Sequence, residues 1–168
     1  MDLTNKTILI TGATDGIGKV LAEKFSKLGS NIILLGKNSS KLDAVYDQLD
    51  HSFDSQKHLI LEADLSLLNN ESAHEILRAI SNEYDALDGI IHNAAILGTM
   101  TPLEDYELSK WDEVLNINLR APFLLTKTLK SILENSTMPR IIFTSSGVAN
   151  TGRAFWGAYS VSKFGLKG

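Results

Sequence analysis

The sequence predicts an α/β protein built on a doubly wound parallel sheet. Two observations along its 168 residues favour this fold class: short apolar runs alternate with helical patterns, and each run is continuously apolar. A continuous apolar run is typical of a strand that is covered on both faces. Strands that alternate with helices favour parallel pairing through helical crossovers. No repeat, low-complexity segment or linker interrupts the pattern, so we expect one domain over residues 1–168.

The expected elements follow this alternation in order. Five apolar runs predict strands: Ile8 to Ile10, Ile32 to Leu35, Leu59 to Leu61, Gly89 to Ile91 and Ile141 to Phe143. Apolar residues at helical spacing predict a first helix, which Gly29 ends: Ile17, Val20, Leu21, Phe25 and Leu28. Further helical patterns cover Ser40 to Leu49, a stretch marked by Ala73, Ile76, Leu77 and Ile80, and about Leu108 to Leu133.

Composition and charge limit the class of protein. Hydrophobic residues make up 43% of the chain and the net charge is -4, which does not indicate a nucleic acid or an anionic membrane as partner. The absence of cysteine excludes disulfides and thiolate metal sites, and we expect no metal site. The segment "MDLTNKTILITG" lacks the pattern of a signal peptide, and runs such as "IILL" are too short to span a bilayer. We expect a soluble, cytoplasmic protein.

The segment "TGATDGIG" connects the first expected strand to the first expected helix. Gly12, Gly16 and Gly18 would let the backbone approach a ligand and let helix and strand pack closely. The helix N-terminus would then offer free N–H groups to a pyrophosphate. A tight glycine turn without a ligand is the alternative. The position between a strand and a helix favours the phosphate site.

The spacing of these glycines resembles that of the short-chain dehydrogenase/reductase family. Members of this family carry TGxxxGxG at this place, whereas its extended branch carries TGxxGxxG, which does not match. The resemblance implies a Rossmann fold that binds NAD(P). It implies that the cofactor contacts this turn through Gly12, Thr14, Asp15, Gly16, Ile17 and Gly18.

The end of the second strand bears on the choice of cofactor. An acidic residue there would bind the ribose 2′-hydroxyl of NAD, but "LLGKNSS" contains none. Lys37 could instead meet a 2′-phosphate, so the sequence favours NADP, with NAD possible. A solvated surface lysine is the alternative. Asp15 weakens the case for NADP slightly, since relatives that prefer NADP often have a basic residue at this place.

Asp64 and Leu65 follow the third strand and resemble the family's pair that contacts the adenine ring. Taken alone, Asp64 could be a helix cap before "LSLLNNE".

The segment "HNAAILG" follows the fourth strand, where the family usually shows Asn-Asn-Ala-Gly bordering the cofactor. Asn93 and Ala94 match this pattern, and His92 and Ala95 depart from it. The methyl group of Ala95 would matter if the position required a positive φ. For His92, we favour a hydrogen-bonded histidine at a strand end over a catalytic one.

The long helical stretch contains a proline. Pro122 cannot donate to the carbonyl four residues earlier, which belongs to Asn118, so the helix should bend there. A buried carbonyl without its donor needs another partner, often water. A plain proline kink is the alternative. The resemblance, carried by Ile117-Asn118-Leu119, implies that the Asn118 carbonyl holds a water in a proton relay.

The segment "RIIFTSSGVANTGRAFWGAYSVSK" contains the strongest pattern. Ser146 ends the fifth strand, Tyr159 follows thirteen residues later, and Lys163 lies four beyond. Residues four apart share a helix face, so phenol and ammonium can point into one cleft. A lysine charge beside a phenol favours the phenolate, which suits a general acid/base at neutral pH. A chance pair is the alternative, but the glycine turn and Asn118 argue against it.

The family resemblance covers the whole chain and implies a mechanism. Hydride passes between a nicotinamide and a small carbonyl or alcohol substrate. Tyr159 would act as the acid/base, Lys163 would tune it and hold the nicotinamide ribose, and Ser146 would orient the substrate oxygen. Asn118 would extend the relay through water. Within the family, "LLGKNSSKL" and "HNAAILG" are most similar to the YciK-type bacterial oxidoreductases. We expect pocket walls near Ile96, Val148 and Trp156.

Family members continue well beyond the catalytic lysine, whereas this sequence stops at "FGLKG". We therefore expect a C-terminally truncated Rossmann domain with the family's last strands missing and its fifth strand an exposed edge. The complete protein is expected to be a homo-oligomer. The competing hypothesis is a truncated module that binds the dinucleotide without turnover.

Overall fold

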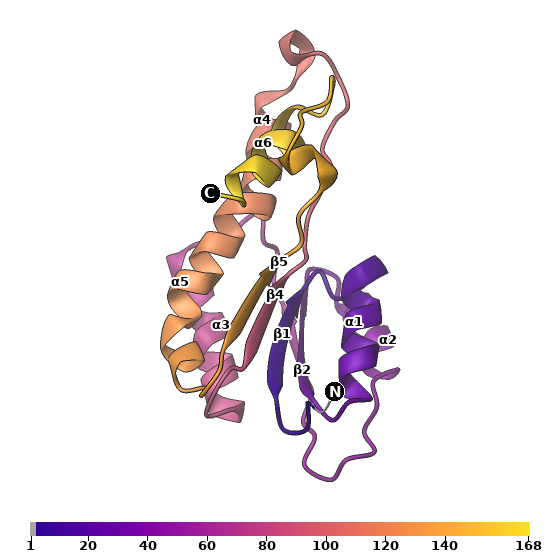
Figure 1. Ribbon diagram of the computed structural model, residues 1–168, viewed down its shortest axis with the longest axis vertical. Helices are drawn as coiled ribbons and strands as arrows, with labels where there is room; N and C mark the ends of the chain where they lie inside the picture. Colours follow the sequence, from indigo (N-terminus) through magenta and orange to yellow (C-terminus); the bar gives the residue numbers. More distant parts are fainter. Residues whose placement is uncertain (1–2) are drawn as a thin grey trace.

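The computed structural model describes residues 3–168 and contains a five-stranded, fully parallel sheet (Figure 1). The strand order is β3-β2-β1-β4-β5. The strands are β1 (Thr7–Thr11), β2 (Asn31–Gly36), β3 (Leu59–Glu62), β4 (Gly89–His92) and β5 (Arg140–Phe143). This confirms the predicted fold class, and each predicted strand is found within two residues of its expected ends. Strand order reverses between β1 and β4, the place where such sheets bind ligands.

Helices cover both faces of the sheet. They are α1 (Gly16–Ser26), α2 (Ser39–Tyr46), α3 (Asn70–Glu83), α4 (Leu108–Leu115), α5 (Ala121–Glu134) and α6 (Gly157–Gly165). Three shorter helical segments are η1 (Leu103–Asp105), the π-helical η2 (Asn116–Arg120) and η3 (Gly147–Ala149). The long stretch from Leu108 to Leu133, predicted as one helix with a bend, is therefore two α-helices joined by a π-helical segment.

Successive side chains of the central strands pack into two separate hydrophobic cores, one on each face of the sheet. Ile8 and Ile10 point to one face, where they pack with residues of α1 and α2 such as Ala22 and Leu42. Leu9 points to the opposite face, which α3 and α5 cover (Figure 1). Because both faces are buried, β1 and β2 read as continuous apolar runs.

Side chains cap the first three helices at their N-termini. Asp15 caps α1, Asn38 caps α2, and Asn69 forms a capping box with Ser72 at the start of α3. The alternative for Asp64, a helix cap, is therefore wrong, because Asn69 takes that place. Gly29 follows α1 with a φ of 88°, as expected of the residue that ends this helix.

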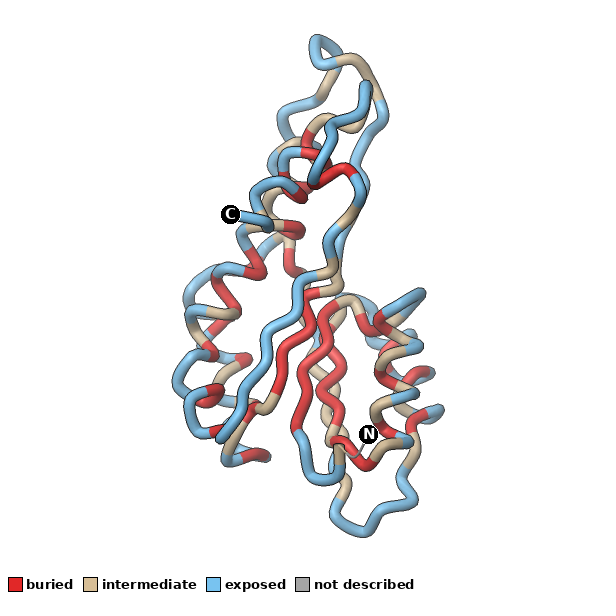
Figure 2. Tube along the Cα trace, viewed as in Figure 1, coloured by how far each residue is buried: buried red, intermediate tan, exposed pale blue. Residues whose placement is uncertain are grey.

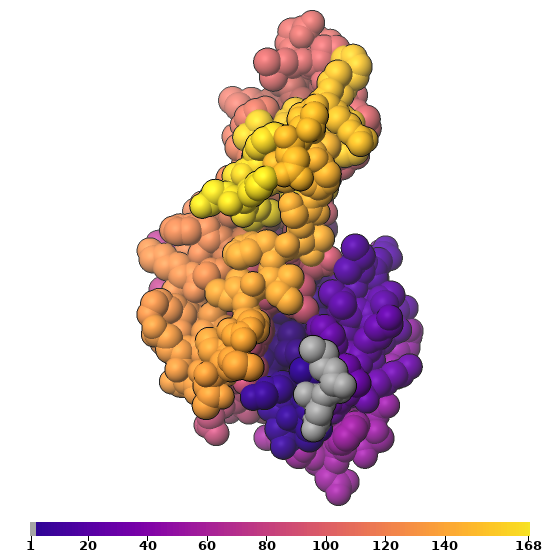
Figure 3. Space-filling model, viewed as in Figure 1, coloured from indigo at the N-terminus to yellow at the C-terminus, as the bar shows by residue number. Residues whose placement is uncertain are grey.

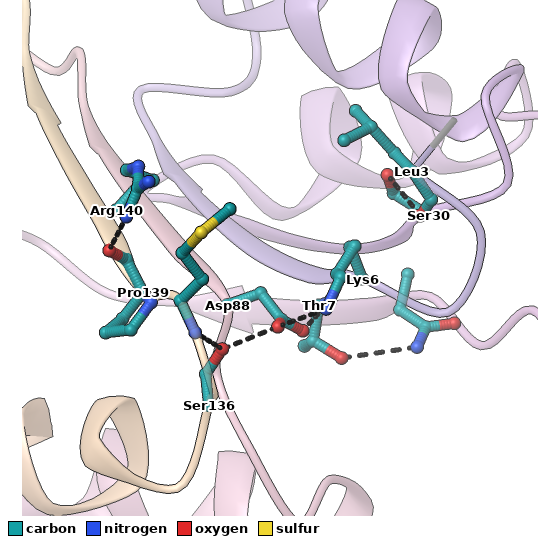
Figure 4. Close-up of polar contacts among 10 residues, drawn as sticks. Leu3, Lys6, Thr7, Ser30, Asp88, Ser136, Pro139 and Arg140 are labelled. Carbon is teal, nitrogen blue, oxygen red and sulfur yellow. Dashed lines mark hydrogen bonds and ion pairs between the residues drawn. The ribbon is translucent and has the colours of Figure 1, made fainter. Parts of the chain in front are cut away.

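Asp88 joins three strands at the amino end of the sheet (Figure 4). Its carboxylate accepts hydrogen bonds from the Thr7 N–H at 2.9 Å and the Ser136 hydroxyl at 2.7 Å, and pairs with the Lys6 ammonium at 3.0 Å. Its main-chain carbonyl accepts from the Arg140 N–H at 3.0 Å. One residue before β4 thus aligns the starts of β1 and β5.

β5 is the least covered strand. All four of its residues are exposed, whereas β1 is buried throughout (Figure 2). Beyond the carboxyl ends of the strands, α4, α6 and the adjoining loops project from the body of the sheet (Figure 3). None of the helices formed by residues 3–168 is both long and apolar enough to cross a membrane.

Candidate active site

The glycine turn between β1 and α1 is closed by contacts that no side chain would allow. A Cβ on Gly18 would lie 2.3 Å from the Gly12 carbonyl oxygen, and a Cβ on Gly12 would lie 2.8 Å from the Cα of Ala94. Gly12 also has a φ of 63°, in the left-handed region that favours glycine. The turn is therefore pressed against the segment that follows β4.

The outer side of the same turn is open. Gly16 has a φ of 50°, and a Cβ there would meet nothing within 4 Å. The side chain of Ile17 is 61% exposed beside it. The Asp15 carboxylate accepts a hydrogen bond from the Gly16 N–H at 2.7 Å, so one N–H group of the helix N-terminus is already used. Thr14 in the same turn is half-buried. A backbone cradle with free space in front fits a phosphate-bearing group.

Asn93 connects the glycine turn to β5. Its amide nitrogen lies 3.3 Å from the carbonyl oxygens of both Thr11 and Gly12, and its amide oxygen accepts from the Thr144 hydroxyl at 3.4 Å. The Thr11 hydroxyl in turn accepts the N–H groups of Asn93 and Ala94, both at 3.1 Å. The turn and the ends of β4 and β5 are thus held as one unit.

The two departures from the family's Asn-Asn-Ala-Gly pattern have structural explanations. Ala95 is exposed and is not among the non-glycine residues with positive φ, so its methyl group causes no backbone strain. His92 is buried, hydrogen-bonded to the Thr126 hydroxyl at 2.9 Å, and stacked on Phe143 at a centroid distance of 4.9 Å. This is the hydrogen-bonded histidine at a strand end that the sequence favoured. Burial lowers the pKa of His92 to about 4.

The residues expected at the adenosine end come from neighbouring strand ends. Lys37 follows β2 and is exposed, and its charge acts on Asp64 after β3. Asp64 accepts hydrogen bonds from the Ser66 hydroxyl at 2.7 Å and the Ser66 N–H at 2.8 Å, which lower the pKa of its carboxyl group. Leu65 is buried in the core. Both hydrogen bonds from Ser66 are made to Oδ1 of Asp64, and the exposed Lys37 is the cation beside this carboxylate.

Asn118 lies in the π-helical segment that separates α4 from α5. The interruption predicted from Pro122 is present, since the Ala121 N–H donates to the carbonyl of Asn116, five residues back. The side chain of Asn118, only 1% exposed, accepts from the Ile96 N–H and donates to the Ile96 carbonyl, both at 2.9 Å. It also donates to the Ser162 hydroxyl at 3.0 Å. Asn118 thereby joins the loop after β4 to α6.

Lys163 lies inside the protein on α6. Its residue is 2% exposed, and its ammonium donates to the main-chain carbonyl of Thr144 at 2.7 Å. The Nζ atom is 5.6 Å from the ring centre of Tyr159, which is half-buried on the same helix. Burial lowers the pKa of Lys163 below its ordinary value. The predicted pair of phenol and ammonium is therefore brought together on one face of α6.

Ser146 precedes η3 and is half-buried, and η3 packs against α6. Of the expected pocket walls, Val148 is buried within η3, and the ring of Trp156 lies 5.8 Å from that of Tyr159. The N–H of Ile96 donates to the side chain of Asn118. Ser146, Tyr159 and Lys163 therefore come from two adjoining elements at the carboxyl end of the sheet.

Thr144 and Ser162 were not predicted from the sequence. The Thr144 hydroxyl donates to Asn93, and its main-chain carbonyl accepts from Lys163. The Ser162 hydroxyl accepts from the side-chain amide of Asn118. Small hydroxyl residues of this kind occur throughout the chain, and only their position two residues from Ser146 and one from Lys163 could have indicated them. Among residues 3–168, no cluster of histidine and acidic side chains could hold a metal ion.

The parallel sheet, with its glycine turn at the switch point and its tyrosine–lysine helix beyond β5, has a Rossmann-type architecture. The chain belongs to the short chain dehydrogenase family, whose sequence model matches residues 6–168. It is therefore a member of an oxidoreductase family.

Individual relatives agree with this assignment. The chain is 37% identical over 166 residues to the oxidoreductase YciK of Escherichia coli (strain K12), a match that covers 99% of this chain and 66% of YciK. It is 32% identical over 166 residues to the 3-oxoacyl-(acyl-carrier-protein) reductase FabG of Aquifex aeolicus (strain VF5), covering 99% of this chain and 65% of FabG. The chain thus spans about two thirds of the length of these relatives.

A solved structure matches the fold closely. A short chain dehydrogenase from Escherichia coli CFT073, complexed with NADPH, superposes with a TM-score of 0.92 and 37% identity. The match covers 99% of this chain and 69% of that one.

Proposed function

We propose that this protein is an NADP-dependent oxidoreductase that interconverts a carbonyl and an alcohol. The observation that carries the proposal is the buried ammonium of Lys163, 5.6 Å from the ring centre of Tyr159. A desolvated positive charge beside a phenol stabilises the phenolate, which makes proton transfer by the phenol easier. A chance pair on a helix surface would leave the lysine in water.

The residues of the glycine turn fit a dinucleotide. The open space before Gly16 would receive the phosphates, with Gly12 and Gly18 keeping the turn closed behind them. Lys37 would meet a 2′-phosphate, while Asp64 and Leu65 would border the adenine ring, and Asn93, Ala94 and Ala95 would border the nicotinamide half. The relative complexed with NADPH supports the choice of NADP. When bound, NADPH supplies the hydride.

In the reduction, the carbonyl carbon gains the hydride and the carbonyl oxygen gains the proton of the Tyr159 hydroxyl, which yields an alcohol. Ser146 would donate a hydrogen bond to the same oxygen and so orient it. Lys163 would stabilise the resulting phenolate and hold the ribose. The main-chain carbonyl of Asn118 would hold a water that returns the proton to Tyr159. Oxidation of an alcohol runs the same steps in reverse.

The proposal is tested by NADPH oxidation against a panel of ketones and aldehydes, with Tyr159→Phe as the deciding variant. Loss of the phenolic proton should lower the rate by roughly 10²–10⁴-fold, the usual contribution of general acid–base catalysis. NADPH binding, followed by fluorescence, should be unchanged. Equal rates for wild type and Tyr159→Phe on a substrate that is turned over would contradict the role of Tyr159.

A second candidate is a module that binds the dinucleotide without turnover. It is favoured by the exposed apolar residues of β5, which leave the edge of the sheet beside the site uncovered. Saturable binding of NADPH, with no oxidation across the panel, would favour this candidate over the enzyme.

A further inference from the structure

A strained turn stands directly before the helix that carries Tyr159. The Trp156 N–H donates to the carbonyl of Arg153 at 3.2 Å, which closes a four-residue turn. Its third residue, Phe155, has a φ of 69°, in a region where such turns normally place glycine. The Phe155 side chain is 54% exposed, so burial of its ring does not offset the strain. Backbone strain of this kind is often retained at functional sites.

The turn places a cation over the ring that neighbours the proposed acid/base. The guanidinium carbon of Arg153 lies 5.5 Å from the ring centre of Trp156, and the Trp156 ring centre lies 5.8 Å from that of Tyr159. Guanidinium, indole and phenol are therefore linked by successive contacts. The indole restrains the arginine through a cation–π interaction.

The guanidinium of Arg153 has no hydrogen-bond partner among residues 3–168. The residue is exposed, and over residues 3–168 its guanidinium takes part in none of the hydrogen bonds or ion pairs that the structure shows. By contrast, the ammonium of Lys167 at the end of the chain donates to the Asn150 amide oxygen at 2.6 Å. Arg153 thus presents N–H donors in a fixed planar arrangement that matches a carboxylate.

We propose that Arg153 binds a carboxylate group of the substrate, so that the site accepts oxo-carboxylates in preference to neutral carbonyl compounds. The carbonyl group would lie at Tyr159 and the carboxylate at Arg153, with the indole of Trp156 as an apolar wall for the carbons between them. Arg153 is therefore a specificity-determining residue. This inference rests on the proposed function for the position of the carbonyl group, but the recognition of the carboxylate can be measured by binding alone.

The binding experiment uses Trp156 as its reporter. The chain has two tryptophans, so Trp111→Phe leaves Trp156 as the single one. In this background, with NADP present, tryptophan fluorescence is titrated with oxo-carboxylates of increasing chain length and with their methyl esters. We expect at least one oxo-carboxylate to bind roughly ten- to a hundredfold more tightly than its ester, the range of a charge-assisted hydrogen bond. Arg153→Gln should remove this difference, and Arg153→Lys should restore part of it.

Arg78→Gln is the matched control, because Arg78 is an exposed arginine on α3, away from the site. It should leave the preference for the acid intact. If no oxo-carboxylate binds more tightly than its ester, or if Arg153→Gln weakens acid and ester equally, the proposal is wrong.

Initial rates of NADPH oxidation separate this proposal from the proposed function. Arg153→Gln should raise KM for the preferred oxo-carboxylate about tenfold or more and leave kcat and the methyl ester's KM unchanged. A merely structural role would alter both substrates together. Absence of turnover with every carbonyl compound would refute the proposed function, while the fluorescence titration would still decide the role of Arg153.

Discussion

The ammonium of Lys163 donates a hydrogen bond to the main-chain carbonyl of Thr144 at 2.7 Å. Thr144 also donates from its hydroxyl to the Asn93 amide oxygen at 3.4 Å, and the amide nitrogen of Asn93 lies 3.3 Å from the Gly12 carbonyl oxygen. The catalytic lysine of the proposed mechanism and the glycine turn of the proposed cofactor site are thus connected through two residues.

Lys163→Met should separate catalysis from stability. Removing the charge removes the stabilisation of the Tyr159 phenolate, so we expect the rate of NADPH oxidation to fall by roughly 10²-fold or more. The free energy of unfolding should change by only about 1 kcal/mol, because loss of the hydrogen bond to Thr144 is offset by relief of a buried charge. Urea denaturation measures this change in the free energy of unfolding. A large loss of stability together with unchanged activity would contradict the assignment.

Gly18→Ala should lower the stability of the fold, whereas Gly16→Ala should mainly weaken NADPH binding. A methyl group on Gly18 would meet the Gly12 carbonyl oxygen at 2.3 Å, so we expect a destabilisation of about 1–3 kcal/mol. A methyl group on Gly16 enters open space, and its φ of 50° costs only about 1 kcal/mol. It would, however, occupy the place proposed for the phosphates, so the Kd for NADPH should rise at least tenfold. Thermal melts and NADPH titrations of both variants test this contrast, and unchanged NADPH affinity of Gly16→Ala would argue against the phosphate site.

Lys37→Gln should change the choice of cofactor. If Lys37 meets the 2′-phosphate, its loss should weaken NADPH binding roughly tenfold and leave NADH binding unchanged, because only NADPH carries that phosphate. Lys41→Gln, an exposed lysine on α2, is the matched control. Fluorescence titrations with both nucleotides measure the ratio. Unchanged binding of both nucleotides would mean that Lys37 is a solvated surface lysine.

Asn118→Ala should unfold more easily because it leaves buried polar groups without partners. The Ile96 N–H and carbonyl, both bound at 2.9 Å, would lose their hydrogen bonds, at a cost of about 2–4 kcal/mol in the free energy of unfolding. Asn116→Ala in the same π-helical segment is the control, since the side chain of Asn116 makes none of the hydrogen bonds found within residues 3–168. Urea denaturation should show little change for this control. Similar losses in the two variants would show that the π-helical segment, and not the amide of Asn118, is what matters.

Stability should fall between about pH 6.5 and pH 4 through His92. Burial lowers the pKa of His92 from 6.5 to about 4 in the folded state, so the unfolded chain binds the proton more readily. The stabilisation is complete above the unfolded pKa and is lost as pH falls towards the folded one, by about 3 kcal/mol in total. His58, half-buried, has its pKa lowered mainly by burial and acts in the same direction.

His92→Asn should flatten this pH dependence, measured as the free energy of unfolding at a series of pH values. His74→Asn, an exposed histidine on α3, is the control and should retain the wild-type slope. Identical slopes for wild type and His92→Asn would show that another group titrates.

Local patterns in the sequence were sufficient for the architecture. The continuous apolar runs predicted all five strands. In β1 and β2 these runs are buried on both faces of the sheet, the environment that such runs indicate. The spacing of Tyr159 and Lys163 predicted one helix face, since helical periodicity is a local property. Pro122 predicted the interruption near Asn118 because a missing N–H donor has its effect within one turn.

Contacts between distant segments could not be predicted in this way. Nothing near Thr144 in the sequence indicates that its carbonyl meets Lys163 and its hydroxyl meets Asn93, and nothing near Asn118 indicates that its amide holds Ile96 and Ser162. The same is true of the ring of Phe143 against His92.

The sequence by itself determined the fold class, the order of strands and helices, the glycine turn and the tyrosine–lysine pair, because each depends on residues a few positions apart. Only the tertiary structure decided that the ammonium of Lys163 is buried, that the side chain of Asn118 bonds to Ile96 and Ser162, and that Arg153 lies over Trp156. Burial and hydrogen-bond partners depend on which surfaces meet when the sheet and helices pack, and the pattern of one segment contains no information about the segment that it will face.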